Sequence, residues 1–291
     1  MKRCVYITMD DMGDYVSDAD LSIEPMQKLG WEIEKISWRA GVDWNEFDLA
    51  YICTPWDYHQ HLDEFLAVID EIDQSSCVLA NPAPTIHWNA DKHYLEELSS
   101  KGVSVVPSLW FDTFSPESLE KAFADFGTDR IVIKPTVGAS ALDTHVLKGM
   151  PDADFLQQLD SAYKGRPYFL QPFLQTVSDV GEYSLMYVDG EFSHAILKVP
   201  KPGDFRTQEE HGSDIRSYTA SVAMVAQGQE LVDSLDPAVA YARVDYVDAE
   251  DGTLWLMELE LIEPSLYFRT NEGSAARFAR AMNRYYERHR S

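Results

Sequence analysis

Cysteine is scarce in this chain of 291 residues. The three cysteines, Cys4, Cys53 and Cys77, are odd in number, widely spaced and without a CxxC pair. This pattern excludes a disulfide framework and a zinc-cysteine cluster, and it favours a reducing cytoplasm. Cys53 has no base beside it in the sequence, so we interpret it as a small buried apolar side chain and not as a nucleophile.

Positive charge is also in short supply, with 24 Lys and Arg against 49 Asp and Glu, a formal net charge of -25. Such a balance opposes binding to nucleic acid or to anionic lipid, so neither is an expected partner. The sequence has no apolar run of about eighteen residues, and Asp10 and Asp11 interrupt its first apolar segment. Neither a membrane span nor a signal peptide is therefore predicted.

Several common nucleotide and hydrolase motifs are missing. No Gly-Lys dipeptide occurs, which excludes a P-loop, and no GxGxxG follows an apolar run. HExxH and GxSxG are absent as well. Any bound nucleotide would therefore have to be held by a different set of residues.

The first ninety or so residues alternate between short apolar segments and amphipathic segments. Strands are predicted at 4–9, 31–38, 49–54 and 77–80, and helices at 23–29 and 62–72. This alternation predicts an open parallel α/β sheet that ends near the turn-rich "NPAPT" at 81–85.

The remaining two thirds have a different pattern. A helix is predicted at 91–101, a strand at 103–111 and a helix at 116–125, followed by short strands with turns from residue 131. Asp189-Gly190 lies between two apolar runs and predicts a β-hairpin. We expect mixed antiparallel α+β structure here, with units at 1–88, 89–170 and 171–291. A final helix at 275–288 should bury Phe278 and Met282 and expose its arginines to solvent.

Two glutamates stand out in the apolar run "LWLMELELIEPS" at 254–265. Glu258 and Glu260 are two residues apart, so on a strand they lie on the same face and must share a proton or face a cation. Asp245, on the preceding apolar run across a predicted hairpin, adds a third carboxylate. Carboxylates without histidine suit Mg²⁺. The alternative is a solvent-facing strip of an edge strand paired with surface lysines.

Three lysines supply a possible phosphate site. Lys134 ends the apolar strand "IVIK", before a loop rich in Gly, Ala, Ser and Thr whose N–H groups could line phosphates. Lys92 opens a predicted helix, and Lys198 ends the strand "SHAILK". Each lysine alone suits the protein surface, but together with the loop and the carboxylates they favour a nucleotide site.

With these residues in place, nearly the whole chain resembles the ATP-grasp superfamily. Lys92 and Lys134 resemble its phosphate-binding lysines, "TVGAS" its phosphate loop, "QPFL" its adenine hinge, and "LMELELIEP" its metal strand with Glu260 in place of Asn. The resemblance implies nucleotide contacts from Lys92, Lys134, Gly138, Ser140, Gln171, Phe173, Leu174 and Glu182, the last of these at the ribose. It implies metal ligands at Asp245, Glu258 and Glu260, and leaves the number of metal ions open.

A narrower likeness concerns the amino-acid ligases of the superfamily. It implies that Lys198 and Arg206 approach the γ-phosphate or acyl phosphate, and that Arg243 stabilises a tetrahedral oxyanion. The stretches "TPWDY", "NPAPTIHWNADKHYL" and "ELELIEPSLYF" resemble the O-ureido-D-serine cyclo-ligase branch of cycloserine biosynthesis. Such a likeness does not determine the substrate.

The resemblance implies an ATP-dependent ligase that uses Mg²⁺, or Mn²⁺ in its place. It would convert a small amino-acid-like carboxylate to an acyl phosphate and form an amide, with cyclisation within one molecule as one form. The loop at 136–144 would close over the intermediate. Two alternatives stay open: a phosphotransferase with the same nucleotide site, and a nucleotide-binding regulator without turnover. The oligomeric state is also open, a homo-oligomer included.

The pocket for the second substrate group is expected at the N-terminal sheet. Asp10, Asp11, Trp56, Asp57 and Tyr58 follow predicted strand ends, where open α/β sheets bind ligands. For Trp56 and Tyr58, packing between domains is the alternative.

Overall fold

The structure is a computed structural model that describes residues 1–139, 141–249 and 251–290. Its N-terminal part is a parallel sheet in the order β2 (Trp31–Ser37), β1 (Lys2–Thr8), β3 (Leu49–Thr54) and β4 (Val78–Ala80). Cys4 and Tyr6 of β1 pack toward one face, and Val5 and Ile7 pack toward the other. The predicted parallel α/β sheet is confirmed, because β1 pairs in parallel with β2 and β3, and β3 pairs in parallel with β4.

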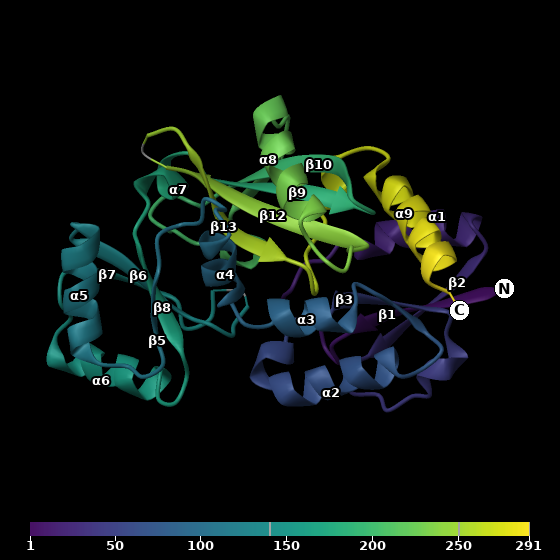
Figure 1. The fold of residues 1–291 in the computed structure, drawn as a ribbon, viewed down its shortest axis with the longest axis horizontal. Coiled ribbons are helices and arrows are strands. Elements are labelled where there is room, and N and C mark those ends of the chain that lie inside the picture. Colours follow the sequence, from purple (N-terminus) through teal and green to yellow (C-terminus); the bar gives the residue numbers. More distant parts are fainter. Residues whose placement is uncertain (140, 250, 291) are drawn as a thin grey trace.

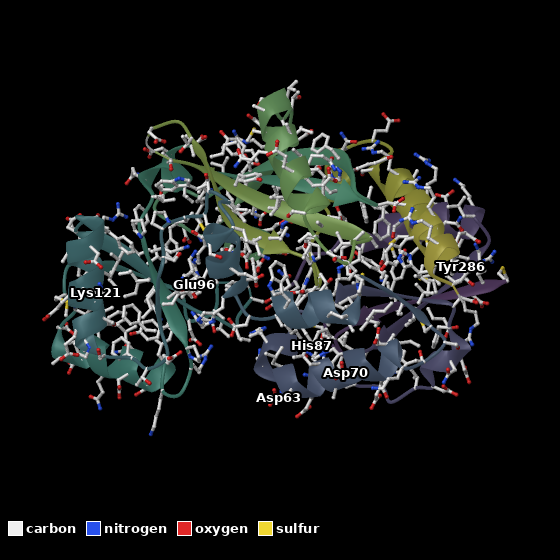
Figure 2. All side chains as sticks on the ribbon, viewed as in Figure 1. Asp63, Asp70, His87, Glu96, Lys121 and Tyr286 are labelled. Carbon is white, nitrogen blue, oxygen red and sulfur yellow. The ribbon has the colours of Figure 1, made fainter. Side chains whose placement is uncertain are left out.

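The two faces of this sheet are covered by helices from different parts of the chain (Figure 1). Helices α2 (Leu62–Asp73) and α3 (Ala83–Asn89) cover one face. Helix α1 (Ile23–Lys28) and the C-terminal helix α9 (Ser274–His289) cover the other. Tyr286 of α9 packs edge-on against Trp31 of β2, with ring centroids 4.9 Å apart (Figure 2). The C-terminus therefore completes the N-terminal core.

The "NPAPT" stretch differs from the prediction of a turn, because α3 begins inside it. Pro82 is the N-cap of α3, and the helix continues to Asn89. Helix α4 (Tyr94–Ser100) starts three residues later than predicted. The reason is local: the Asp91 carboxylate accepts a hydrogen bond from the His93 N–H at 2.9 Å, and this turn precedes the helix.

A central antiparallel sheet has the order β5 (Leu109–Phe111), β8 (Tyr168–Pro172), β6 (Arg130–Pro135) and β7 (His145–Lys148). Helices α5 (Pro116–Phe126) and α6 (Ala153–Ala162) share its core. The predicted strand 103–111 was too long. Pro107 has no N–H for a ladder, and Val105 instead pairs with Leu256 in the C-terminal sheet.

The C-terminal sheet is antiparallel, in the order β11 (Asp214–Tyr218), β10 (Glu191–Val199), β9 (Glu182–Val188), β12 (Tyr241–Asp248) and β13 (Leu254–Glu260). Asp189 and Gly190 form the predicted hairpin, with φ of 54° and 77°. Helix α7 (Gln175–Asp179) contacts β12 of this sheet, and helix α8 (Val222–Asp233) contacts β9 and β10. Single 3-10 turns occur at Ala19–Ser22, Trp44–Glu46, Tyr58–Gln60, Glu209–His211 and Phe268–Thr270.

Helix α9 buries Phe278 and Met282 as predicted, but the prediction of a merely solvated arginine face was wrong. Arg284 donates to Asp189 at 2.8 Å, and Arg288 forms an ion pair with the same carboxylate. Only 6% of the Asp189 side chain is exposed. The arginines thus attach α9 to the β9–β10 hairpin. Within the described ranges, none of the helices combines the length and apolar character needed to cross a membrane.

Candidate active site

One cavity, with a volume of about 220 Å³, receives side chains from all three sheet regions. Trp56 and Tyr58 come from the N-terminal region, Lys134 from the central sheet, and Asp245 and Glu258 from the C-terminal sheet. Most of the residues singled out in the sequence line this one cavity: Lys92, Lys134, Gly138, Phe173, Leu174, Gln171, Glu182, Lys198, Arg206, Arg243, Asp245, Glu258 and Glu260. Ser140 lies outside the described residues.

Three carboxylates meet on one side of the cavity because β12 and β13 pair directly there. Asp245 is opposite Glu258 in the ladder, and Arg243 is opposite Glu260. One carboxylate oxygen from each of Asp245, Glu258 and Glu260 lies within 4.8 Å of the others. The register shifts just beyond Asp245, and bulges of this kind often re-aim side chains near functional sites.

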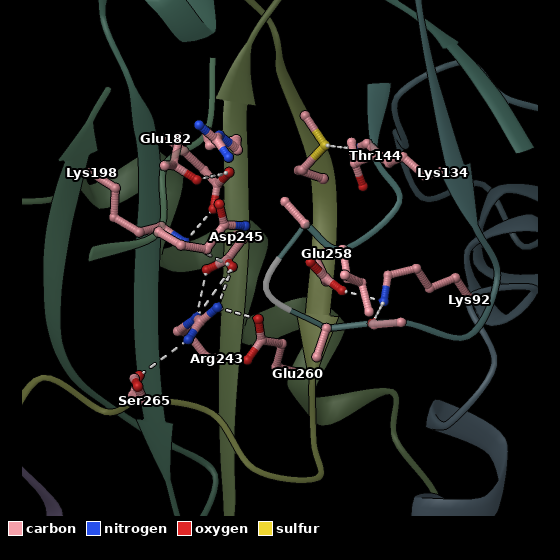
Figure 3. A pocket seen from close by; sticks show the side chains of 18 of the residues that line it. Lys92, Lys134, Thr144, Glu182, Lys198, Arg243, Asp245, Glu258, Glu260 and Ser265 are labelled. Atoms are coloured by element: carbon pink, nitrogen blue, oxygen red, sulfur yellow. Dashed lines mark hydrogen bonds and ion pairs between the residues drawn. The ribbon is translucent and has the colours of Figure 1, made fainter. Parts of the chain in front are cut away.

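Cations face these carboxylates (Figure 3). Lys92 Nζ lies 2.8 Å from Glu258 Oε1. The Arg243 guanidinium donates from Nε to Asp245 Oδ1 at 3.0 Å, and it also binds Glu260. The paired glutamates are therefore neutralised by a lysine and an arginine that are distant in the sequence.

Burial and these cations shift the pKa values of the three acids in different directions. Burial disfavours the charge on Glu258, but Lys92 outweighs it and lowers the pKa. Burial raises the pKa of Glu260 to about 7, although Arg243 opposes the shift. The pKa of Asp245 is lowered, because Arg243 and Lys198 overcome the cost of its burial. The lysine and arginine side chains thus lower the pKa of Asp245 and Glu258 but do not offset the effect of burial on Glu260.

This donor set fits Mg²⁺ or Mn²⁺. All three ligands offer carboxylate oxygens, which hard divalent ions prefer, and they lie close enough to share one ion. Burial, with the nearby charges of Glu258 and Asp245, raises the pKa of Glu260, and a divalent cation would favour its charged form.

Lys198 is almost fully buried behind the carboxylates. Its Nζ lies 3.2 Å from Asp245 Oδ2 and forms a second ion pair with Glu182. The other Glu182 oxygen accepts from the Thr207 hydroxyl at 3.1 Å. Both Glu182 oxygens therefore have partners inside the protein, and one function of Glu182 in this arrangement is to hold Lys198.

Lys92 and Lys134 face the same cavity. The Lys92 N–H donates to Thr136 O at 2.9 Å, and its Nζ donates to Gly138 O at 2.9 Å. The start of the 136–144 loop is thus attached to Lys92 at two points. Lys134 contacts Met257 Sδ at 3.4 Å and has no carboxylate partner among the described residues. Burial lowers its pKa, so this lysine would gain from an anionic ligand.

The hinge residues form an apolar wall beside these lysines. Gln171 is 2% exposed and donates to the Ser108 hydroxyl at 3.0 Å. The Arg130 guanidinium covers the Phe173 ring at 3.5 Å from its centroid. In the loop, a Cβ atom at position 138 would lie 3.0 Å from Pro135 Cγ, closer than an ordinary van der Waals contact.

Arg206 also lines the cavity, but its guanidinium already has a partner. It binds Asp204 through two parallel hydrogen bonds, Nε to Oδ1 at 3.0 Å and Nη2 to Oδ2 at 2.8 Å. Any contact between Arg206 and a phosphate would have to compete with this bidentate pair.

Of the five residues expected to build the substrate pocket, only Trp56 and Tyr58 line the cavity. Asp10, Asp11 and Asp57 do not. The Asp57 carboxylate instead accepts from Trp38 Nε1 at 2.9 Å and pairs with Arg39. This part of the expectation was wrong, because ion pairing within the N-terminal sheet holds Asp57 away from the cavity.

Sequence reasoning missed the residues that hold the edge of β13. The Leu259 N–H donates to the Tyr94 hydroxyl at 3.0 Å, and Asn89 Nδ2 donates to Leu259 O at 2.8 Å. Asn89 Oδ1 accepts from the Leu261 N–H at 2.9 Å. These side chains satisfy the otherwise open edge of the carboxylate-bearing strand. Their closeness to Lys92 in the sequence was the only available signal.

Known proteins with similar sequence and structure decide the family. A family model described as "D-cycloserine synthetase DcsG, N-terminal domain" matches residues 4–81. The cycloserine biosynthesis protein DcsG of Streptomyces lavendulae is 31% identical over 281 residues, covering 89% of this chain and 91% of that protein. The chain belongs to the DcsG family of ATP-grasp ligases.

Solved structures agree with this membership. A crystal structure of D-cycloserine synthetase DcsG superposes with a TM-score of 0.84 at 26% identity, covering 97% of this chain and 99% of the other. The D-alanine–D-alanine ligase of Bacillus anthracis, at 14% identity and covering 100% and 99% of the two chains, shares the fold with a TM-score of 0.70. The predicted ATP-grasp fold is confirmed. As a member of the DcsG family, the chain is an ADP-forming carbon–nitrogen ligase that forms amide bonds using ATP.

Proposed function

We propose that this DcsG-family ligase activates the carboxylate of a small amino-acid-like molecule as an acyl phosphate, and that a side-chain nitrogen of the same molecule then closes a ring. The observation that supports this most is the single cavity in which Lys92, Lys134 and Arg243 surround the carboxylate cluster. Phosphoryl transfer requires positioning and charge neutralisation more than a covalent catalyst.

In this proposal the two lysines bind the nucleotide phosphates, and Asp245, Glu258 and Glu260 hold Mg²⁺ or Mn²⁺. The metal ion would supply charge neutralisation at the phosphates. Gln171, Phe173 and Leu174 form the wall for the adenine, with Gly138 and Ser140 in the phosphate loop and Glu182 toward the ribose.

The first chemical step transfers the γ-phosphoryl group to a substrate carboxylate oxygen, and ADP leaves. In the second step a side-chain N–H nitrogen of the substrate attacks the carbonyl carbon, phosphate leaves, and the nitrogen loses its proton. Arg243 is the proposed stabiliser of the tetrahedral oxyanion. Asp245 and Ser265 O hold its guanidinium in place, the latter at 3.3 Å from Nη1. Lys198 and Arg206 are the proposed additional contacts to the transferred phosphate.

An acyl phosphate must be protected from water. The 136–144 loop is the proposed cover, and its attachment to Lys92 supports this role: Lys92 contacts both the loop, at Gly138 O, and the carboxylate cluster, at Glu258. A nucleotide that engages Lys92 would therefore act on the loop directly.

The substrate is tested by product analysis. Because a relative with high coverage is named for cycloserine biosynthesis, O-ureido-D-serine is the first candidate, followed by D-serine derivatives and a broad amino-acid panel. Each is incubated with ATP and Mg²⁺, and products are identified by mass spectrometry. ADP, phosphate and a cyclised product support the proposal. A stable phosphorylated product would indicate a phosphotransferase, and no substrate-stimulated ADP release across the panel would indicate a regulator without turnover.

A further inference from the structure

Glu263 is an acid of the cavity that the proposed chemistry does not use. It follows β13 by three residues, where the chain leaves the C-terminal sheet, and it lines the same cavity as the carboxylate cluster. Its backbone carbonyl accepts a hydrogen bond from Trp56 Nε1 at 3.0 Å. The position of Glu263 is therefore anchored to the N-terminal region, on the side of the cavity where Trp56 and Tyr58 lie.

The Glu263 carboxylate has no hydrogen-bond or ion-pair partner among the described residues, unlike Glu182 and the three acids of the carboxylate cluster. Each of those four faces a cation in the protein: Glu182 and Asp245 face Lys198, Glu258 faces Lys92, and Glu260 faces Arg243. Burial, with a contribution from Glu260, raises the pKa of Glu263 to about 8. A carboxylate in such a setting is stabilised by any cation that enters the cavity.

Two groups of opposite type in this cavity lack a partner. Lys134 has no acid partner among the described residues. Glu263 has no cationic partner among them, and its backbone is held by Trp56. A ligand set with phosphates at Lys134 and a positive group at Glu263 would give each of them a partner.

Tyr267, near Arg243 in the same cavity, is a second, independent sign that the cavity is built for a ligand. It is 7% exposed and lines the cavity, and its hydroxyl has no hydrogen-bond partner in the part of the chain that the structure describes. Its backbone has a φ of 47°, a left-handed conformation that is costly for a bulky residue. Strain of this kind is concentrated at binding and catalytic sites.

We propose that Glu263 binds the ammonium group of an α-amino acid substrate, while the carboxylate of the same substrate faces Arg243. This rests on the proposed function, because it names the feature by which that site selects its substrate. Glu263 is then a specificity residue: it selects for a primary amine beside the carboxylate and rejects the deaminated acid, which would leave its charge unpaired.

The experiment compares amines with their deaminated counterparts. Binding to the full chain with ADP and Mg²⁺ is measured by calorimetry for D-serine, L-serine and O-ureido-D-serine, and for 3-hydroxypropanoic acid and 3-(ureidooxy)propanoic acid. We expect at least one amine to bind the wild type about 10- to 100-fold more tightly than its deaminated partner, as expected for a charged hydrogen bond. Glu263→Gln should remove this preference and leave the affinity of the deaminated acid within about threefold.

Glu96→Gln is the matched control, because it removes the same charge from an exposed position on α4. It should retain the full preference for the amine. If Glu263→Gln is poorly folded by thermal unfolding, Glu263→Ala replaces it, and a preference equal to that of the wild type would overturn the inference. So would a wild type that binds no amine better than its deaminated partner, or a Glu263→Gln variant that weakens both ligands equally. A wild type that prefers the amine but releases no ADP would support the role of Glu263 and contradict the proposed function.

Discussion

Asn81 connects the N-terminal sheet to the strands that carry the candidate metal ligands, and replacing it is a sharp test of the structure. Its Nδ2 donates to Tyr241 O at 2.9 Å and to Leu261 O at 2.6 Å, and its Oδ1 accepts from the Ala240 N–H at 2.7 Å. The residue is fully buried, and its φ of 64° is in the left-handed region that asparagine tolerates. One amide thus satisfies backbone groups on both sides of the active-site hairpin.

Asn81→Asp keeps the shape of the side chain and removes both donors. Two buried carbonyl oxygens then lose a partner, at about 1–3 kcal/mol each, and face a carboxylate oxygen instead. We expect the free energy of unfolding to fall by about 3–6 kcal/mol at pH 7, a large part of the roughly 5–15 kcal/mol of a typical protein. Urea unfolding followed by circular dichroism measures this loss.

The pH dependence gives an internal check. Burial raises the pKa of the new Asp in the folded state above its unfolded value, so the folded state binds more protons in between. Stability is then lost as pH rises through this window, and the difference from the wild type should narrow as pH falls from 7 toward 5, because the protonated acid regains a donor. Asn81→Gly is the control: it keeps the left-handed backbone and adds no titratable group, so its difference in stability from the wild type should not change between pH 7 and pH 5. A change within about 0.5 kcal/mol for Asn81→Asp, or a difference that widens at low pH, would refute the reasoning.

Three further predictions concern the active site and the C-terminal helix. Glu258→Gln should abolish Mg²⁺-dependent ADP release while the circular dichroism spectrum stays native; unaltered turnover would contradict the metal assignment. Arg243→Lys retains the charge but loses the guanidinium fork, so kcat should fall about 10- to 100-fold with the KM for ATP nearly unchanged, and an effect confined to the KM for ATP would argue against an oxyanion role. Asp189→Asn suits the turn but loses the ion pair with Arg288, and it should lower the free energy of unfolding by about 1–2 kcal/mol at pH 7. Burial opposes the charge on Asp189, but Arg288 outweighs it and lowers the pKa, so this difference should disappear as pH falls through the folded pKa, and a difference independent of pH would count against the ion pair.

Much of the candidate site was accessible from the sequence because its key features are local. Side chains at i and i+2 on a strand share a face, which was enough to place Glu258 beside Glu260. The tight Asp189-Gly190 turn and the apolar runs of the N-terminal sheet were likewise readable from neighbouring residues. Where local chemistry misled, as at "NPAPT" and at Pro107, the error was in where an element begins or ends.

The sequence by itself determined the parallel N-terminal sheet, the hairpin strands and the types of residue in the cavity, because strand and helix periodicity follow from backbone geometry over a few residues. Only the tertiary structure decided which cation faces which acid, that α9 covers the N-terminal sheet, and that Glu263 has no partner among the described residues. These outcomes depend on contacts between residues far apart in the chain. Packing, and not local preference, selects such contacts, because the burial of a charge or an apolar face is favourable only once its distant partner is in place.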